Sequence, residues 1–304
     1  MAALLLEQTL NGLQLGVTLF LMAAGLTLVF GVMDVVNLAH GAFYMVGAYL
    51  TAWLARLTGS FALALLGAVG LTALLGLLVE RLAVSRLYAR DHLAHVLGTF
   101  GLLLLLDELV SLAFGPRPIF LDPPAALAGQ ITLLGTPYPA FRLAVLAAGL
   151  AAALFLWWLI TRTRVGMWIR AGATNREMLG ALGVDVRLLF ALVFALGCGL
   201  AALAGGMAGP LYGVRLGMGE DVLILTFVVI VVGGIGSVRG ALAGALVVGL
   251  VDTLGRAFLP GLLGALLERS EADALGASLA TVAIYVLMAA ILAVRPRGLF
   301  PAGA

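Results

Sequence analysis

Polar residues interrupt the first long apolar run of this chain. Within residues 25–41, Asp34, Asn37 and His40 stand between two apolar stretches, and no loop-like sequence separates those stretches. Polar side chains and broken backbone cost free energy in hydrocarbon, so such a segment is tolerated where it packs on protein or lines a wet cavity. The interruption therefore predicts a broken helix beside a pathway through a membrane.

Composition places the whole chain in a membrane. Hydrophobic residues make up 63% of its 304 residues and charged residues 11%, whereas soluble domains carry about 25% charged residues. The apolar runs lie at about 10–31, 38–55, 61–79, 96–114, 141–160, 188–213, 221–235, 240–259 and 275–294. Since a span needs about 20 apolar residues, we expect an all-α integral membrane protein, a single transmembrane domain over residues 1–304, with eight or nine transmembrane or re-entrant helices.

Several kinds of site are excluded by the residues present. All 17 basic residues are arginine, so the phosphate loop that needs a lysine cannot form, and any ATP must bind another subunit. Asp91, His92 and His95 resemble metal ligands by type, but no fourth ligand is evident, and we interpret them as a solvated loop. The single cysteine, Cys198, is interpreted as a small buried thiol. The sequence predicts no enzyme, no metal site and no cofactor.

Arginine placement in the short connections predicts orientation. Connections 80–95 and 161–187 and the tail with Arg295 and Arg297 are rich in arginine and are expected on the cytoplasmic side. Connections 115–140 and 260–274 are expected outside. Alternation between these anchors predicts an external N-terminus. The first residues include Glu7 and lack a basic n-region, and the apolar run from Leu10 to Val32 is too long for a signal-peptide core, so we expect an uncleaved first span.

A second interruption resembles the first. Asn37 to Ala42 precede one helix rich in small residues, and Gly234 to Ala241 precede another. Paired interruptions are typical of inverted-repeat transporters whose pathway lies between the repeats, here halves of about 1–140 and 141–304; chance recurrence of glycine and alanine is the alternative. The candidate pathway residues are Asp34, Asn37, His40, Gly41, Gly234, Gly236 and Ser237.

The polar residues of the first interruption allow three interpretations. At a spacing of three residues, Asp34, Asn37 and His40 would spread over one broad side of a helix. They would lie at the cytoplasmic mouth of the pathway or pin the broken backbone, or they would simply cap the start of the second helix from water. A proton relay would need a further acid, for which the candidates are Asp107, Glu108 and Asp252.

Stripes of small residues predict close helix packing, either within the chain or between subunits. Their members stand four residues apart and are Gly197, Ala201 and Gly205 in one stripe and Gly236, Gly240 and Gly244 in the other.

Connection 161–187 contains a predicted short helix. Thr174 or Asn175 can cap it, Glu177 suits its first turn, and Gly183 suits a left-handed end. The helix residues of interest are Thr174, Asn175, Arg176, Glu177, Met178, Leu179, Leu182 and Gly183. The apolar face of Met178, Leu179 and Leu182 fits a groove of a partner protein, and the arginines equally fit an anionic lipid surface.

Four segments together resemble one family, in order along nearly the whole chain. They are Gly31–Tyr49, Arg170–Val184, Gly233–Gly240 and Arg295–Phe300, and they are similar to the branched-chain amino acid ABC-transporter permeases, the first of the two permease types. The resemblance implies a prokaryotic inner-membrane protein, a heterodimer with a second permease, two cytoplasmic ATPases, an external substrate-binding protein, and no nucleic-acid partner. It also implies that residues 174–184 form the helix that couples to the ATPase.

The resemblance leaves the substrate open. Related permeases move urea, short amides or other amino acids, and an ion-coupled secondary transporter or a passive channel would share broken helices. Gly172 and Gly180 stand where bulkier residues are commoner in the family, so the length of the coupling helix stays open.

Overall fold

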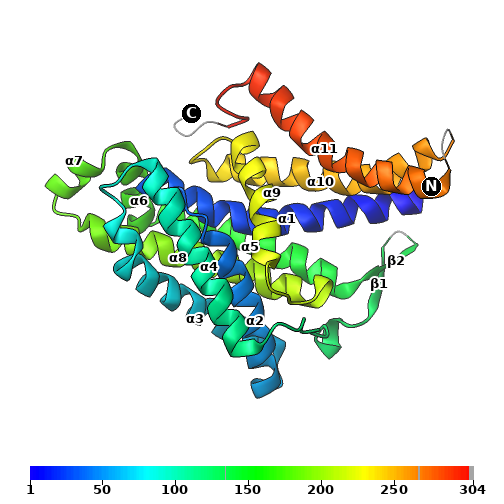
Figure 1. Ribbon diagram of the computed structural model, residues 1–304, viewed down its shortest axis with the longest axis horizontal. Helices are drawn as coiled ribbons and strands as arrows, with labels where there is room; N and C mark the ends of the chain where they lie inside the picture. Colours follow the sequence, from blue (N-terminus) through cyan, green and yellow to red (C-terminus); the bar gives the residue numbers. More distant parts are fainter. Residues whose placement is uncertain (134, 266–267, 301–304) are drawn as a thin grey trace. The chain divides into compact units, whose positions relative to one another are not determined.

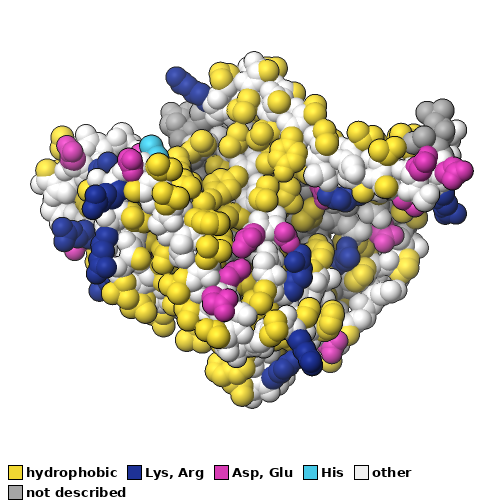
Figure 2. Space-filling model, viewed as in Figure 1, with side chains coloured by type: hydrophobic (Ala, Val, Ile, Leu, Met, Phe, Trp, Pro, Cys, Tyr) yellow, Lys and Arg dark blue, Asp and Glu magenta, His cyan; other side chains and the backbone are white. Residues whose placement is uncertain are grey.

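The computed structural model describes residues 1–133, 135–265 and 268–300 and is mostly helical (Figure 1). Seven of the described helices are long and apolar enough to cross a membrane. They are α1 (Ala2–Met33), α3 (Phe61–Leu82), α4 (His92–Phe114), α5 (Ala140–Arg162), α8 (Val186–Tyr212), α10 (Val238–Leu263) and α11 (Arg269–Val294). Apolar side chains cover much of the face in Figure 2, as lipid contact requires. The chain is therefore a helical membrane protein.

The remaining elements are shorter. They are α2 (His40–Thr58), α6 (Arg164–Thr174), α7 (Arg176–Ala181), α9 (Met218–Gly233), the 3-10 turns η1 (Val84–Arg86) and η2 (Ala125–Leu127), and the strands β1 (Gln130–Leu133) and β2 (Thr136–Pro139). Neither α2 nor α9 is among the helices that qualify as membrane spans.

An antiparallel hairpin occupies the proline-rich connection 115–140. Ile131 pairs with Tyr138, and Leu133 pairs with Thr136. Gly135, with a φ of 82°, follows β1 in a conformation that glycine adopts without strain. Residue 134 in this connection and residues 266–267 in the connection 260–274 lie outside the described residues.

The chain divides into two compact units that interleave along the sequence. The first unit comprises Met1–Ala23, Ala125–Leu150 and Thr226–Ala304, and the second comprises Ala24–Pro124 and Ala151–Leu225. Helices α1, α5 and α9 each contribute residues to both units. The predicted halves of about 1–140 and 141–304 were inferred from a repeat in the sequence, which is a different division from these units, and they stay a prediction.

Close backbone contacts build the core of the second unit. Helix α2 packs on α3 and α8, and most of its residues are buried. A Cβ at Gly47 would lie 2.3 Å from Ala202 Cα, and a Cβ at Gly205 would lie 1.9 Å from the Tyr44 carbonyl oxygen. Since lipid provides no hydrophobic drive for helix association, van der Waals contact of this kind holds α2 and α8 together.

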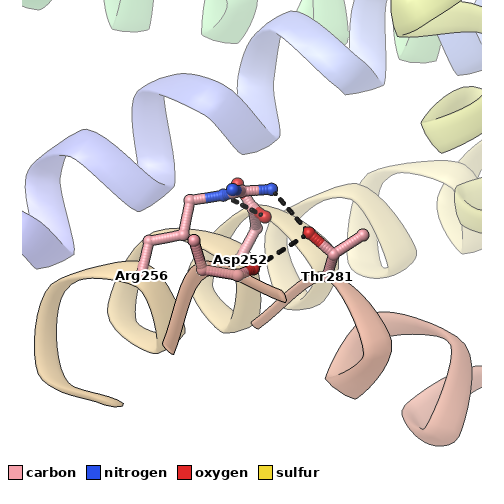
Figure 3. A network of polar contacts seen from close by, with 4 residues as sticks. Asp252, Arg256 and Thr281 are labelled. Atoms are coloured by element: carbon pink, nitrogen blue, oxygen red, sulfur yellow. Dashed lines mark hydrogen bonds and ion pairs between the residues drawn. The ribbon is translucent and has the colours of Figure 1, made fainter. Parts of the chain in front are cut away.

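The first unit combines a glycine crossing with a charged pair. Helix α1 crosses α10 where a Cβ at Gly249 would lie 2.5 Å from the Gly16 nitrogen. Asp252 of α10 accepts a hydrogen bond from Arg256 Nε at 2.8 Å, and Arg256 also donates to Thr281 of α11 at 3.0 Å (Figure 3). The pair neutralises two charges within a span and ties α10 to α11.

We predict that Gly205→Ala destabilises the protein. The added methyl group meets backbone of α2, and overpacking of this kind costs about 1–3 kcal/mol. The measurement is the thermal denaturation midpoint of the detergent-solubilised chain. The matched control is Gly101→Ala in α4, where nothing lies within 4 Å of the added atom; alanine there favours the helix by up to about 1 kcal/mol. Equal midpoints for the two variants would contradict the prediction.

Candidate functional site

The first interruption is a true break between α1 and α2. Residues 34–39 are not helical, and Asp34 has a φ of 55°, which is uncommon for a residue with a side chain. Asp34 is exposed, whereas Asn37 and His40 are fully buried. The expectation that the three residues share one side of a helix is therefore wrong, because the backbone between them is not helical. Nor does a side chain cap α2, whose N-cap residue is Ala39.

Thr99 of α4 holds this break. Its buried hydroxyl accepts the Leu38 N–H at 3.1 Å, and its own hydrogen is within bonding distance of the carbonyls of Val36, at 3.1 Å, and His95, at 2.7 Å. The hydroxyl thus replaces a helical acceptor that the break removes. Thr99 was not singled out from the sequence, and the available signal was a hydroxyl residue near the start of an apolar run.

Glycines let the break pack tightly in the second unit. A Cβ at Gly41 would lie 2.6 Å from the Gly219 carbonyl oxygen, so the start of α2 meets the start of α9 backbone to backbone. A Cβ at Gly25 would lie 2.8 Å from the Gly197 carbonyl oxygen and 3.0 Å from His40 Cε1. Ala201 of the same stripe as Gly197 is fully buried. The buried side of the break is therefore enclosed by α1, α8 and α9.

Asn37 lies in this enclosed region with its side-chain amide unsatisfied. Neither its nitrogen nor its oxygen has a hydrogen-bond partner among the described residues. A buried polar group without a partner costs about 1–3 kcal/mol. The break is thus locally destabilised by Asn37 and stabilised by Thr99.

The predicted coupling helix is shorter than expected, and a separate helix, α6, precedes it. Helix α6 ends at Thr174, and α7 begins after Asn175, whose side-chain oxygen accepts the Met178 N–H at 2.9 Å. Asn175 is thus the cap, Glu177 lies in the first turn, and Gly183 has a φ of 84°. Helix α7 is shorter than residues 174–184 because the extended Asn175 and the left-handed Gly183 bound it.

The apolar face of α7 differs from the expected one. Met178 and Leu182 are 58% and 75% exposed, but Leu179 is only 4% exposed. The Leu179 side chain lies 3.4 Å from a Cβ position at Gly172, so it packs within its own unit. Met178 and Leu182 remain available to another molecule, next to the exposed Arg176.

An open hollow joins α7 to the first break. Its volume is about 290 Å³, and its lining consists of Gly31, Val32, Asp34 and residues 172–177. The end of α1 and the turn between α6 and α7 thus face each other within the second unit. At the edge of the hollow, Val32 Cγ1 lies 3.6 Å from the Cβ position at Gly172, so the end of α1 packs on α6.

The second break lies in the first unit, between α9 and α10. Gly234 and Gly236 have φ values of 108° and 81°, and the Ser237 hydroxyl caps α10 by accepting the Gly240 N–H at 3.1 Å. Gly236 precedes α10, so the predicted helical stripe that included it is wrong at this position, because the chain leaves the helix there. Within α10, Gly240 and Gly244 meet α9: their Cβ atoms would lie 2.2 Å from the Gly233 oxygen and 2.6 Å from the Val229 oxygen.

The tail after α11 completes the second break. It turns back toward the end of α9 (Figure 1), where the Leu299 N–H donates to the Val232 carbonyl and the Phe300 N–H to the Gly233 carbonyl, both at 2.9 Å. Gly298, with a φ of 81°, approaches so closely that a Cβ there would lie 2.6 Å from Gly234. These bonds satisfy carbonyls that a helix end leaves free. The sequence identified this tail only by its arginines and its motif.

The interpretation of Asp91, His92 and His95 as a solvated loop is wrong for His95, which is buried within α4. Several titratable residues of connection 80–95 have structural contacts. Asp91 caps α4 by accepting the Ala94 N–H at 3.0 Å, and His95 Nε2 lies 2.9 Å from the Leu87 carbonyl oxygen. The Tyr88 hydroxyl donates to Glu80, and burial raises the pKa of Tyr88.

Comparison with known proteins identifies the family. Residues 8–294 match the family model described as "Branched-chain amino acid transport system / permease component". The chain is 31% identical over 278 residues to the high-affinity branched-chain amino acid transport system permease protein LivH of Escherichia coli, covering 84% of this chain and 87% of LivH. It is 29% identical over 308 residues to the permease protein BraD of Pseudomonas aeruginosa, covering 97% of this chain and 95% of BraD.

An archaeal relative extends the likeness. The probable branched-chain amino acid transport permease protein LivH of Methanocaldococcus jannaschii is 28% identical over 258 residues, covering 81% of this chain and 79% of the relative. No solved structure matches the chain significantly. The apolar helices and these relatives make it a multi-pass membrane protein of a prokaryote. The chain belongs to the family of permease components of branched-chain amino acid transport systems.

Proposed function

We propose that this chain forms part of the translocation path of an ABC importer for branched-chain, hydrophobic amino acids in a prokaryotic inner membrane. It pairs with a second permease subunit as a heterodimer, with two cytoplasmic ATPase subunits and with an external substrate-binding protein. The substrate class is that of the relatives LivH and BraD, which are permease proteins of branched-chain amino acid transport systems. The observation that carries the mechanism is the hollow that places the α6–α7 turn against the first break.

Coupling follows from this placement. The exposed Met178 and Leu182 seat in a groove of the ATPase, as apolar residues of a short helix do. When the ATPases close, α7 and the end of α6 move, and the packing of Val32 at the Gly172 position passes the movement to the end of α1. The break then exchanges one set of contacts for another, and the unsatisfied amide of Asn37 favours a second arrangement in which that amide is paired.

The finer architecture is part of the proposal. Eight or nine helices cross or enter the membrane when α2 and α9 are counted with the seven long spans. The two breaks support an inverted repeat, since each follows one helix end, α1 or α9, and precedes a helix with glycines against its neighbour, α2 or α10.

Acidic substitution on α7 is predicted to release the ATPase. Met178→Glu and Leu182→Glu place a carboxylate in an apolar groove, and loss of a central anchor costs about 2 kcal/mol, or about thirtyfold in affinity. The measurement is the amount of ATPase that co-purifies with the tagged chain. The control is Leu57→Glu, which changes an exposed leucine near the C-terminal end of α2. This variant should retain the ATPase. Normal uptake driven by a proton gradient in the α7 variants would instead support an ion-coupled transporter.

Removal of the Thr99 hydroxyl is predicted to loosen the first break. Thr99→Val leaves the Leu38 N–H without its acceptor, at a cost of about 1–3 kcal/mol. We expect more ATP hydrolysed per amino acid transported by the reconstituted complex, because the break follows α7 less faithfully. Thr99→Ser keeps the hydroxyl and should keep the coupling ratio. If the serine variant changed the coupling ratio and the valine variant did not, the role assigned to the Thr99 hydroxyl would be refuted.

The isolated chain is predicted to bind leucine weakly. A ligand shifts a two-state protein only through unequal affinity for its states, so tight capture belongs to the external binding protein. Titration calorimetry of the purified chain should show no saturable high-affinity signal. Submicromolar binding, or uphill uptake by vesicles that contain this chain alone, would contradict the proposal. Downhill flux of urea without nucleotide would point to a channel.

A further inference from the structure

Six exposed residues form one surface at the second break, which we name the tail surface. They are Ile235, Arg239, Val294, Arg295, Arg297 and Phe300. The surface is continuous because Leu299 and Phe300 are hydrogen-bonded to the last residues of α9, and Gly298 contacts Gly234. All of it lies within the first unit.

The positive charge of the tail surface is not balanced by acidic residues in the neighbouring segments of the first unit. Residues 226–251 and 274–300 contain arginine but no acidic residue. Within the described residues, Arg239 and Arg297 have no hydrogen bond or ion pair from their side chains, and Arg295 donates only to the Leu299 carbonyl, at 3.3 Å. The surface therefore presents guanidinium groups with free donors.

The position of Arg239 strengthens the requirement for an anion. It is the second residue of α10, and a positive charge near a helix N-terminus is unfavourable because the helix dipole is also positive there. An anionic group beside Arg239 would offset both charges. No carboxylate within the described part of this unit supplies one.

The apolar residues indicate what kind of anion fits. Val294 is 81% exposed and precedes Arg295 at the end of α11, a candidate membrane span, and Phe300 is 51% exposed in the tail that follows. Arginine beside exposed apolar side chains at the end of a span is the composition of a membrane interface. A soluble phosphate would satisfy the arginines alone and leave the apolar side chains in water.

We propose that the tail surface binds the head group of an anionic phospholipid in the leaflet on the predicted cytoplasmic side. Arg239, Arg295 and Arg297 contact the phosphate, and Ile235, Val294 and Phe300 contact the upper acyl chains. The lipid thereby holds the tail against α9 and keeps the second break closed by the Leu299 and Phe300 bonds.

The test measures lipid retention by native mass spectrometry of the chain released from nanodiscs of phosphatidylcholine with added phosphatidylglycerol. The wild-type chain should retain phosphatidylglycerol in preference to phosphatidylcholine. Each Arg→Gln substitution on the tail surface should weaken retention about fivefold, and R239Q/R295Q/R297Q together about a hundredfold. Inorganic phosphate should not displace the lipid. The readout is binding to the chain itself, so it does not depend on which solute is transported.

The matched control removes the same charge elsewhere. R81Q/R86Q/R90Q changes three exposed arginines of the connection 80–95 and should retain the lipid. Equal loss in both triple variants would show attraction by net charge alone and overturn the site, as would displacement by phosphate. Loss of co-purifying ATPase from R239Q/R295Q/R297Q in purely neutral lipid would assign the surface to a protein partner instead. Should the triple variant fail to fold, R297Q alone gives the same comparison against R90Q.

Discussion

Backbone groups in hydrocarbon must find their hydrogen bonds within the protein. Both breaks of this chain meet that requirement through hydrogen bonds to a segment that is distant in sequence. At the first break, the Thr99 hydroxyl of α4 accepts the Leu38 N–H. At the second, the amides of Leu299 and Phe300 donate to the last carbonyls of α9. Without these partners each break would leave polar backbone unsatisfied, and a continuous helix would be more stable.

Glycine makes these contacts between distant segments sterically possible. Gly234 and Gly298 both have left-handed backbone and approach each other at the second break, where a side chain on either would collide with backbone. Gly41 and Gly219 have the same role beside the first break. The small residues therefore do more than pack long helices, since they let a broken segment lie against its neighbours at backbone distance.

The sequence predicted the features that depend on local composition. Each apolar run coincides with a helix, and Asn175 and Gly183 bound α7 as their local chemistry requires. It did not predict Thr99 or the tail bonds, because both join residues far apart in sequence. The inward side chain of Leu179 was also missed: a helix as short as α7 has no decisive periodicity, and packing on α6 and α8 selects its buried face.

The two breaks have different neighbours, and this difference bears on mechanism. The first faces the α6–α7 turn across the hollow, whereas the second is bonded to the tail. On the proposed function, an ATPase therefore drives only the first break of each chain, and the tail restrains the second. A lipid bound to Arg239, Arg295 and Arg297 would increase that restraint. Motion within this chain then concentrates at the first break, while the second stays restrained by the tail.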